Sequence, residues 1–420
     1  MNFRNHEIGI LILLLTLLPS WQYCAILVVV LFYKVMSRRG QIPKNSLYAL
    51  QPLLLMIAVG MVFASNNLLY AALKDLWYLV KVLLIAMVGI MIGFKAQPSL
   101  KWLQITVFYS ALAIFIELLI FGVATMSGQS AMLLPAFVPI FIAIFYLRST
   151  SHKKTRDKML CWLLGALVLA AILLSESRTT LLVTFIVWIG AAGYFQSKTK
   201  ITLCAVALVA VAIVAVPQLP LYDPHNISFL GKVQNSLTEL SFVAGDEMTS
   251  ITANWRGFEA LRAYKAWQTG SFGQQLFGQG LGATTDIGFY YNLSESYWVR
   301  YLPILHNGYF MVLVKYGVLG VALFVAFMAF PLFLRLRTSD PYSKLGQKMA
   351  VTASVVLLVT TLSITGPLNI SKLDGITMIM GWALGVQFRM RLLNYAPVRK
   401  RTVNAGNASL PNRLYSVRGG

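Results

Sequence analysis

Three side chains in this sequence, Arg178, Arg256 and His306, lie apart from the basic loops that hold most cations. Arg178 and His306 border long apolar runs, and Arg256 lies in the long segment between two such runs. A guanidinium group binds phosphate or carboxylate through two parallel hydrogen bonds. A histidine changes protonation state near neutral pH and can take up the proton of a hydroxyl group. These residue types therefore predict anion binding combined with general acid–base chemistry.

Arg178 lies in a short turn, Ser-Glu-Ser-Arg-Thr-Thr-Leu-Leu, between two apolar runs. Two interpretations fit this turn. In one, Ser175 or Ser177 caps a helix and Arg178 pairs with Glu176 or reaches lipid headgroups. In the other, Arg178 clamps an anion, and Thr179 adds a hydroxyl donor at a helix start that already favours anions.

Arg256 lies in the segment Asn-Trp-Arg-Gly-Phe-Glu-Ala-Leu-Arg-Ala-Tyr-Lys-Ala-Trp, which predicts a helix. On that helix Arg256, Ala260 and Ala263 share one face, and the small alanines leave space beside the guanidinium for a large ligand. Arg262 lies on another side, within reach of Glu259. The alternative is an amphipathic helix on the bilayer surface with its cations on headgroups.

His306 is one of four histidines and, with Asn307, directly precedes an apolar run. A histidine at the end of a membrane span is either an interfacial anchor or a group that exchanges a proton with substrate. The position of His306 favours the second role, because it leads from a polar loop into the membrane near the level expected for Arg178.

Motifs of several other enzyme classes are absent from the sequence, including the Walker loop, GxSxG and HExxH. The Gly-Gln-Gly-Leu-Gly run at 278–282 follows no predicted strand and is interpreted as a turn. Cys24, Cys161 and Cys204 all lie in apolar runs without a CxxC pair, which argues against a disulfide framework or a metal site. We therefore expect no metal and no other cofactor.

The elements that position these side chains are predicted to be membrane-spanning helices. Of the 420 residues, 58% are hydrophobic and 12% charged, about half the charge of a soluble protein. A span needs roughly 20 apolar residues, and the predicted spans are 8–20, 22–36, 48–65, 76–94, 102–123, 131–147, 159–175, 179–196, 201–218, 309–334, 347–365 and 373–391. The sequence predicts an all-α polytopic membrane protein with about 12 transmembrane helices.

The Lys and Arg residues fix the orientation of these spans, because cations in short loops mark the cytoplasmic side. The basic set comprises Arg4, Lys34, Arg38, Arg39, Lys44, Lys95, Lys101, Arg148, Lys153, Lys154, Arg156, Lys158, Lys198, Lys200, Arg335, Arg337, Lys344, Lys348 and a tail from Arg389 to Arg418. Both termini are then cytoplasmic, and the three candidate side chains face outward. The net charge of +21 belongs to these loops, so no nucleic-acid partner is expected.

Four regions follow from this layout. Residues 1–218 carry nine transmembrane helices, 219–305 form a large outer loop, 306–391 carry three more helices, and 392–420 form a basic, disordered cytoplasmic tail near anionic lipids. Long loops in compact proteins are either functional or disordered. This loop is rich in Trp, Tyr and Phe, so we expect it to fold and to hold the site.

Two spacing patterns resemble those of the O-antigen ligase family. His306 and Asn307 are followed by nine residues and then Gly-Val-Leu-Gly at 317–320, which matches the family's His-[Asn/Ser]-x9-Gly-x2-[Gly/Thr/Tyr]. Arg178 and Leu182 match its Arg-x-x-x-Leu in an outer turn, and the helix from Arg256 with the following glycine turn is similar to its loop. The resemblance covers roughly residues 160–335; the first half matches in span layout only.

The resemblance implies a membrane-embedded glycosyltransferase of the bacterial inner membrane, with a periplasmic active site and an undecaprenyl-diphosphate-linked glycan as donor. Ligases of the family transfer the glycan to lipid A–core, whereas polymerases extend a second lipid-linked glycan; the exact His-Asn motif and the chain length favour a ligase here. Arg178 and Arg256 are candidates to stabilise the diphosphate leaving group, which makes a metal unnecessary. His306 is the candidate base or positioning group. Arg262, Asn307 and Thr179 are candidate substrate-binding residues.

A transporter, such as a flippase for lipid-linked glycans, is the alternative from another class. Twelve spans suit it, and Lys81, Glu117 and Lys315 are intramembrane charges of the kind that transporters use. Against it, the sequence has no visible repeat halves, and its unusual residues gather on one side of the membrane. A glycosyltransferase, but not a transporter, is expected to bring Arg178, Arg256 and His306 together in one outer cavity.

Overall fold

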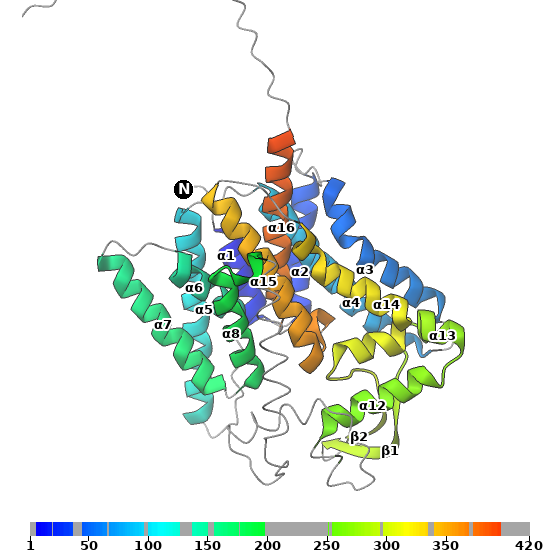
Figure 1. Ribbon diagram of the computed structural model, residues 1–420. Coiled ribbons are helices and arrows are strands. Elements are labelled where there is room, and N and C mark those ends of the chain that lie inside the picture. Colours follow the sequence, from blue (N-terminus) through cyan, green and yellow to red (C-terminus); the bar gives the residue numbers. More distant parts are fainter. Residues whose placement is uncertain are drawn as a thin grey trace, which may run out of the picture.

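The computed structural model describes residues 6–18, 20–36, 44–64, 67–95, 100–126, 137–149, 155–175, 177–197, 251, 254–294, 297–334, 340–368 and 373–395. Its helices are α1 (Glu7–Leu17), α2 (Ser20–Met36), α3 (Lys44–Val62), α4 (Leu69–Lys95), α5 (Leu100–Met126), α6 (Phe137–Ser149), α7 (Thr155–Ser175), α8 (Arg178–Ala191), α12 (Trp255–Gln268), α13 (Phe272–Phe277), α14 (Gly308–Phe333), α15 (Pro341–Ser363) and α16 (Asp374–Tyr395), with short 3-10 turns η3 (Tyr194–Gln196) and η5 (Gly366–Leu368). Figure 1 shows a bundle of inclined helices, with α12 and a β-hairpin at one end of it.

The first eight predicted spans coincide with α1 to α8, and the last three coincide with α14 to α16. The ninth predicted span, 201–218, lies outside the described residues, as do residues 219–250 and the tail after Tyr395. Within the described part of the chain, α4, α14 and α15 are long and apolar enough to cross a membrane, and six further apolar helices are shorter. The fold is a helical membrane protein, and the count of twelve spans stays a prediction.

The centre of the bundle is the contact between α4 and α16. A Cβ atom at Gly93 of α4 would overlap the backbone of Trp382, and one at Gly385 of α16 would overlap the backbone of Ile90. Small residues let membrane helices approach backbone to backbone, where dispersion contacts replace the missing hydrophobic drive. Trp382 is almost completely buried in this core.

The two ends of the bundle differ in their side chains. Arg148 at the end of α6 lies 4.5 Å from the ring centroid of Trp188 in α8, and Arg389 of α16 donates to the Lys95 carbonyl oxygen at 3.3 Å. These contacts belong to the end where α16 finishes, and α12 and the hairpin lie at the opposite end (Figure 1). All three cations belong to the set predicted to be cytoplasmic.

One part of the loop is not helical. Strands β1 (Thr285–Ser294) and β2 (Tyr297–Leu302) form an antiparallel hairpin in which Thr285 pairs with Leu302 and Asn292 with Trp298. The sequence predicts an all-α protein whose loop is rich in aromatic residues, and it assigns no strands there. Aromatic and β-branched residues favour strands because they pack well on a pleated surface, which accounts for the hairpin.

The predicted sidedness can be tested by cysteine labelling. In a variant whose natural cysteines are replaced by serine, a cysteine at Gln268, which is exposed on α12, should react with a membrane-impermeant maleimide from the periplasmic side. A cysteine at Gln234 serves as a second probe, at a position outside the described residues. Ser339, in a predicted cytoplasmic loop, is the control. Labelling of Gln268 only after the inner membrane is permeabilised would contradict the assigned topology.

Candidate active site

His306 lies immediately before α14 and contacts one acidic residue of α12. The Glu259 Oε2 atom is 2.9 Å from His306 Nδ1 and accepts the His306 backbone N–H at 3.0 Å. The Glu259 side chain is 3% exposed, whereas that of His306 is 49% exposed. One edge of the imidazole is therefore held by a buried carboxylate while about half of the side chain stays open to an incoming molecule.

Asparagine caps fix the start of α12, which carries Glu259, and of α14, which directly follows His306. Asn307 is the N-cap of α14, and its side-chain oxygen accepts the backbone N–H groups of Tyr309 at 3.0 Å and Phe310 at 3.3 Å. Asn254 caps α12 by accepting from Gly257 N at 3.2 Å. An Asn at this position satisfies donors that the first helical turn leaves unpaired. The start of each helix is thus fixed within a few residues of the Glu259–His306 contact.

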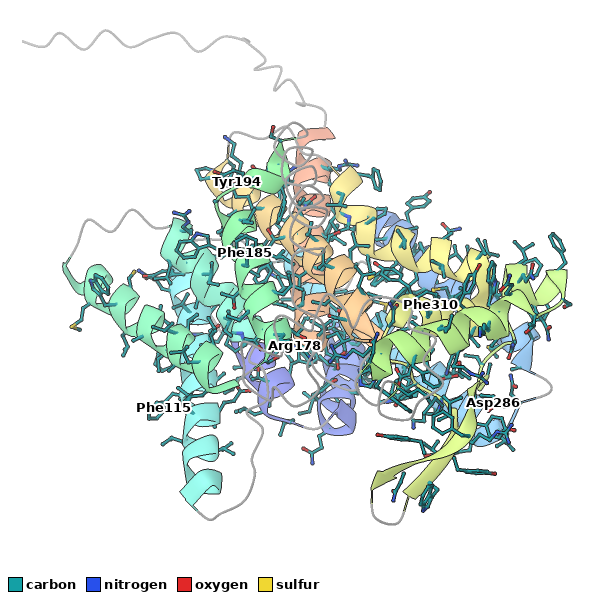
Figure 2. All side chains as sticks on the ribbon, turned by 60° about the horizontal axis from the view of Figure 1, so that its bottom comes forward. Phe115, Arg178, Phe185, Tyr194, Asp286 and Phe310 are labelled. Carbon is teal, nitrogen blue, oxygen red and sulfur yellow. The ribbon has the colours of Figure 1, made fainter. Side chains whose placement is uncertain are left out.

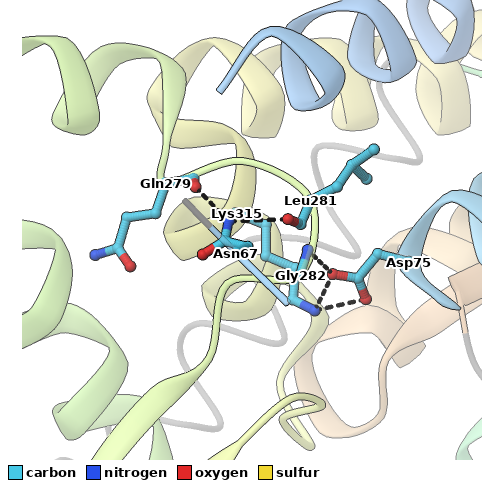
Figure 3. Close-up of polar contacts among 6 residues, drawn as sticks. All are labelled: Asn67, Asp75, Gln279, Leu281, Gly282 and Lys315. Atoms are coloured by element: carbon cyan, nitrogen blue, oxygen red, sulfur yellow. Dashed lines mark hydrogen bonds and ion pairs between the residues drawn. The ribbon is translucent and has the colours of Figure 1, made fainter. Parts of the chain in front are cut away.

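A glycine turn after α13 anchors the loop to the membrane helices (Figure 3). Asn67 Nδ2 donates to the carbonyl oxygens of Gln279 and Leu281, both at 2.9 Å. Gly282 N donates to Asp75 Oδ2 at 2.7 Å, and Lys315 Nζ lies 2.6 Å from both oxygens of the same carboxylate. The segment expected to be a turn is confirmed as one. It binds Asp75 of α4, and the same carboxylate joins α4 to α14 through a buried ion pair with Lys315.

The glycine that follows Asn307 after nine intervening residues, Gly317, has a geometric reason. Gly317 interrupts α14 with φ +64°, and Gly278 of the turn has φ +80°. A Cβ atom at Gly317 would overlap the backbone of Leu276, and one at Gly278 would overlap the backbone of Lys315. Positive φ and close backbone approach both select glycine. In the His-Asn-x9-Gly motif, the Asn thus caps the start of α14, and the Gly lies at the kink against which the glycine turn packs.

Removal of the Lys315 charge should destabilise this anchor. Lys315→Met leaves Asp75 as an uncompensated buried charge, a loss worth about 3–5 kcal/mol, so the unfolding temperature of detergent-purified protein should fall. The double variant Asp75→Asn/Lys315→Met should recover most of it, because the Asn oxygen still accepts the Gly282 N–H. Lys265→Met, at an exposed position of α12, is the control. Equal unfolding temperatures for Lys315→Met and the control would refute a stabilising pair.

The hairpin packs on α12 through aromatic rings and through Arg262. Trp255 stacks on Tyr291 with centroids 4.4 Å apart, and Arg262 Nε donates to the Asp286 carbonyl oxygen at 2.9 Å. Arg262 was expected within reach of Glu259, but it contacts the hairpin, and Glu259 contacts His306. A substrate-binding role for Arg262 remains a proposal.

An exposed ion pair joins the two strands. Arg300 Nε donates to Asp286 Oδ1 at 2.9 Å, and Arg300 Nη2 donates to Oδ2 at 3.0 Å. These hydrogen bonds, with one from Gly288 N, lower the pKa of Asp286 to about 2, and the same carboxylate raises the pKa of Arg300. The pair therefore supports the hairpin above the ordinary carboxyl range, and this support is lost as pH falls toward about 2.

Arg178 is the first residue of α8. Ser177 caps the helix, and its side-chain oxygen accepts Thr180 N at 3.3 Å, so the predicted serine cap is confirmed; Glu176 lies outside the described residues. Thr179 is half-buried, while the Thr180 side chain is 1% exposed and its hydroxyl has no hydrogen-bond partner among the described residues. In Figure 2, Arg178 lies toward the same end of the molecule as Asp286, and Tyr194 lies at the opposite end.

The helices bring some of the predicted site residues together. Arg256 lies on α12 three residues before Glu259, so the two are neighbours on the helix surface, and Glu259 contacts His306. Arg178 belongs to α8, which packs on α15, and α15 packs on α14. Ala260 and Ala263 are buried, and the space for a ligand beside Arg256 stays a prediction. The convergence of Arg178 with the α12–α14 residues remains a proposal.

Two residues that the sequence did not single out are central to this arrangement, Glu259 and Asp75. Glu259 is the one acidic residue in α12, and it is buried, as are its neighbours in the sequence, Phe258 and Ala260. An acidic residue among apolar positions of a basic helix signals a buried partner. Asp75 offers a similar signal as a carboxylate in the first turns of an apolar helix.

The intramembrane charges that favoured a transporter have structural partners. Lys315 pairs with Asp75, and Lys81 Nζ lies 2.9 Å from Asp374 Oδ2, which also accepts from the Tyr23 hydroxyl. Both ion pairs are almost fully buried within the bundle. Glu117 is also buried, and its Oε2 atom has no partner among the described residues. Two of the three charges are thus explained as ties between helices.

Comparison with known proteins gives a family match that covers this part of the chain. Residues 163–325 match a family model described as O-Antigen ligase. The matched range runs from α7 to the middle of α14 and includes Arg178, Arg256, Glu259 and His306, and it confirms the resemblance seen in the sequence. No curated protein matches the chain. Within the described residues, no group of three or more His, Cys, Asp or Glu side chains could hold a metal ion.

Proposed function

Since residues 163–325 place this chain in the O-antigen ligase and polymerase family, we propose that it is a ligase-type glycosyltransferase. It moves an undecaprenyl-diphosphate-linked glycan onto a sugar of lipid A–core at the periplasmic face of the bacterial inner membrane. The family supports ligase or polymerase activity on lipid-linked glycans. The choice of lipid A–core as acceptor follows the His306-Asn307 motif and the chain length.

The observation that carries this proposal is the Glu259–His306 contact at the head of α14. A half-exposed imidazole held by a buried carboxylate has the arrangement of a general base, because its ring is fixed while one edge can meet a hydroxyl group. Arg256 lies three residues before Glu259 on α12, so a cation is available close to the same point.

The reaction then has a simple charge balance. The acceptor hydroxyl oxygen attacks the anomeric carbon and loses its proton to His306, while the carbon–oxygen bond to the diphosphate breaks and its electron pair leaves with the diphosphate. Diphosphate needs charge stabilisation more than it needs a proton. Arg178 and Arg256 supply that stabilisation, since guanidinium groups bind phosphate oxygens bidentately, and no metal is required.

Three further residues take part in substrate binding in this proposal. The side-chain oxygen of Asn307 is used in the cap, so its NH₂ group is the part that meets a sugar or phosphate. Thr179 offers a hydroxyl in the first turn of α8, where helix N–H groups favour anions. Arg262 approaches the substrate with the guanidinium edge that does not contact Asp286.

The acceptor can be identified with purified protein and one labelled lipid-linked glycan. Lipid A–core and unlabelled lipid-linked glycan are offered separately and together. A ligase is expected to label lipid A–core and to leave the length of the lipid-linked glycan unchanged. If label appears only in longer lipid-linked chains, the protein is a polymerase. Label in neither product, with a donor verified on another enzyme, would rule out both activities.

A further inference from the structure

The hydrogen bonds that Glu259 accepts determine which ring nitrogen of His306 carries a hydrogen. Its side chain is 3% exposed, and burial of a carboxylate is costly unless hydrogen bonds compensate it. A single oxygen, Oε2, receives both of the contacts from His306 described above. Two donors on one oxygen from one residue fix the position and the plane of the imidazole.

The carboxylate of Glu259 indicates which ring nitrogen carries the hydrogen. A carboxylate oxygen has no hydrogen to donate, so Glu259 Oε2 only accepts, and it accepts the His306 backbone N–H. Its contact with Nδ1 at 2.9 Å then places a hydrogen on that nitrogen. In a neutral imidazole the other nitrogen, Nε2, then has no hydrogen and presents a lone pair. Because about half of the His306 side chain is exposed, an incoming hydroxyl group can reach the ring.

We propose that Glu259 is the positioning residue of His306: it holds the hydrogen on Nδ1 and presents Nε2 as the atom that takes the acceptor's proton. This inference rests on the proposed function and selects between the two roles that the sequence left open for His306. The acceptor oxygen–carbon bond forms as the carbon–diphosphate bond breaks. The hydroxyl proton moves to Nε2, and the imidazolium later returns it to water.

The charge of Glu259 adds to its role in orientation. Uptake of the proton turns His306 into an imidazolium ion, and the buried carboxylate 2.9 Å from Nδ1 stabilises that ion. Ion pairs of this kind are strong when water is excluded from one partner. A histidine that donated from Nε2 to a phosphate in its neutral form would need the opposite tautomer, which this carboxylate disfavours.

Two variants separate orientation from charge. In Glu259→Gln the amide oxygen still accepts both His306 contacts, so the tautomer is kept and only the charge is lost; we expect kcat to fall at least about tenfold with KM nearly unchanged. In Glu259→Ala both effects are lost, and kcat should fall by about 10²–10⁴-fold. Asp286→Asn, the same kind of change in the hairpin of the same loop, is the matched control and should keep normal turnover.

A spectroscopic measurement tests the tautomer of His306 and needs no activity assay. The chain has four histidines, so the ¹⁵N spectrum of histidine-labelled protein can be assigned by comparison with His306→Ala. At mildly alkaline pH, His306 should show a protonated Nδ1 and an unprotonated Nε2 in the wild type and in Glu259→Gln. In Glu259→Ala the two forms should redistribute. A wild-type His306 with its hydrogen on Nε2 would overturn the inference.

The two proposals fail in different ways. If the wild type transfers no glycan to any acceptor, the proposed function fails, and the ¹⁵N spectrum still tests the tautomer. If the wild type is active and both Glu259 variants match Asp286→Asn in kcat, Glu259 does not position a base and the inference is wrong.

Discussion

His306→Ala is expected to lower glycan transfer by about 10²–10⁴-fold, the range that a general base contributes, while donor binding persists. Wild-type turnover should also fall as acid protonates the ring, because a protonated imidazole cannot take up the hydroxyl proton. Glu259 is the charged group shown to contact the ring. The rates of wild type, His306→Ala and His306→Gln across pH, with one lipid-linked donor, measure this effect.

The variants distinguish proton transfer from simple binding. A histidine that only holds a sugar or phosphate could be replaced by Gln or Asn with much of the turnover retained, and the acid limb would then persist in the variant. His6→Ala is the matched control, since His6 lies 3.3 Å from the Tyr109 hydroxyl in another part of the bundle. Near-normal turnover of His306→Ala would exclude this residue from the mechanism.

Arg178→Lys is expected to remain folded and to lose most of its activity. Lysine keeps the positive charge, but it is a point charge and cannot form the two parallel hydrogen bonds of a guanidinium fork. The Ser177 cap that starts α8 does not involve the Arg178 side chain, so the helix should be retained. Circular dichroism and the transfer rate, measured on the same preparation, separate folding from function.

A second Arg→Lys change provides the comparison. Arg389→Lys alters a guanidinium at the other end of the bundle, where it contacts the Lys95 carbonyl oxygen, and its transfer rate should stay close to that of the wild type. If Arg178→Lys were as active as Arg389→Lys, Arg178 would be a headgroup contact and no clamp for the diphosphate.

Local features of the fold were predictable from the sequence because they depend on neighbouring residues. Apolar runs located the helices from α1 to α8 and from α14 to α16, since helix formation in a bilayer needs a continuous apolar stretch. The serine cap before Arg178 and the turn at 278–282 follow from side chains within a few positions. The hairpin was missed because its aromatic segment, Gly-Phe-Tyr-Tyr-Asn, does not alternate polar and apolar residues.

The site itself depends on contacts between distant parts of the chain. Glu259 and His306 are 47 positions apart, and Asp75 and Lys315 are 240 apart. Helix periodicity indicates which face of α12 carries Glu259, but it contains no information on which helix that face meets. The sequence therefore identified the candidate base and cations, while the residue that orients the base needed the packing of α12 on α14.

In the proposed reaction, the protein breaks the bond between a glycan and a polyprenyl diphosphate as it makes a new glycosidic bond. The most direct test is to count both events in one reaction of the purified protein, with lipid A–core as acceptor and a chelator present. We predict one polyprenyl diphosphate released per linkage formed, and no release without acceptor. If the donor crosses a proteoliposome membrane intact, with neither diphosphate release nor a new linkage, the protein is a transporter and not a glycosyltransferase.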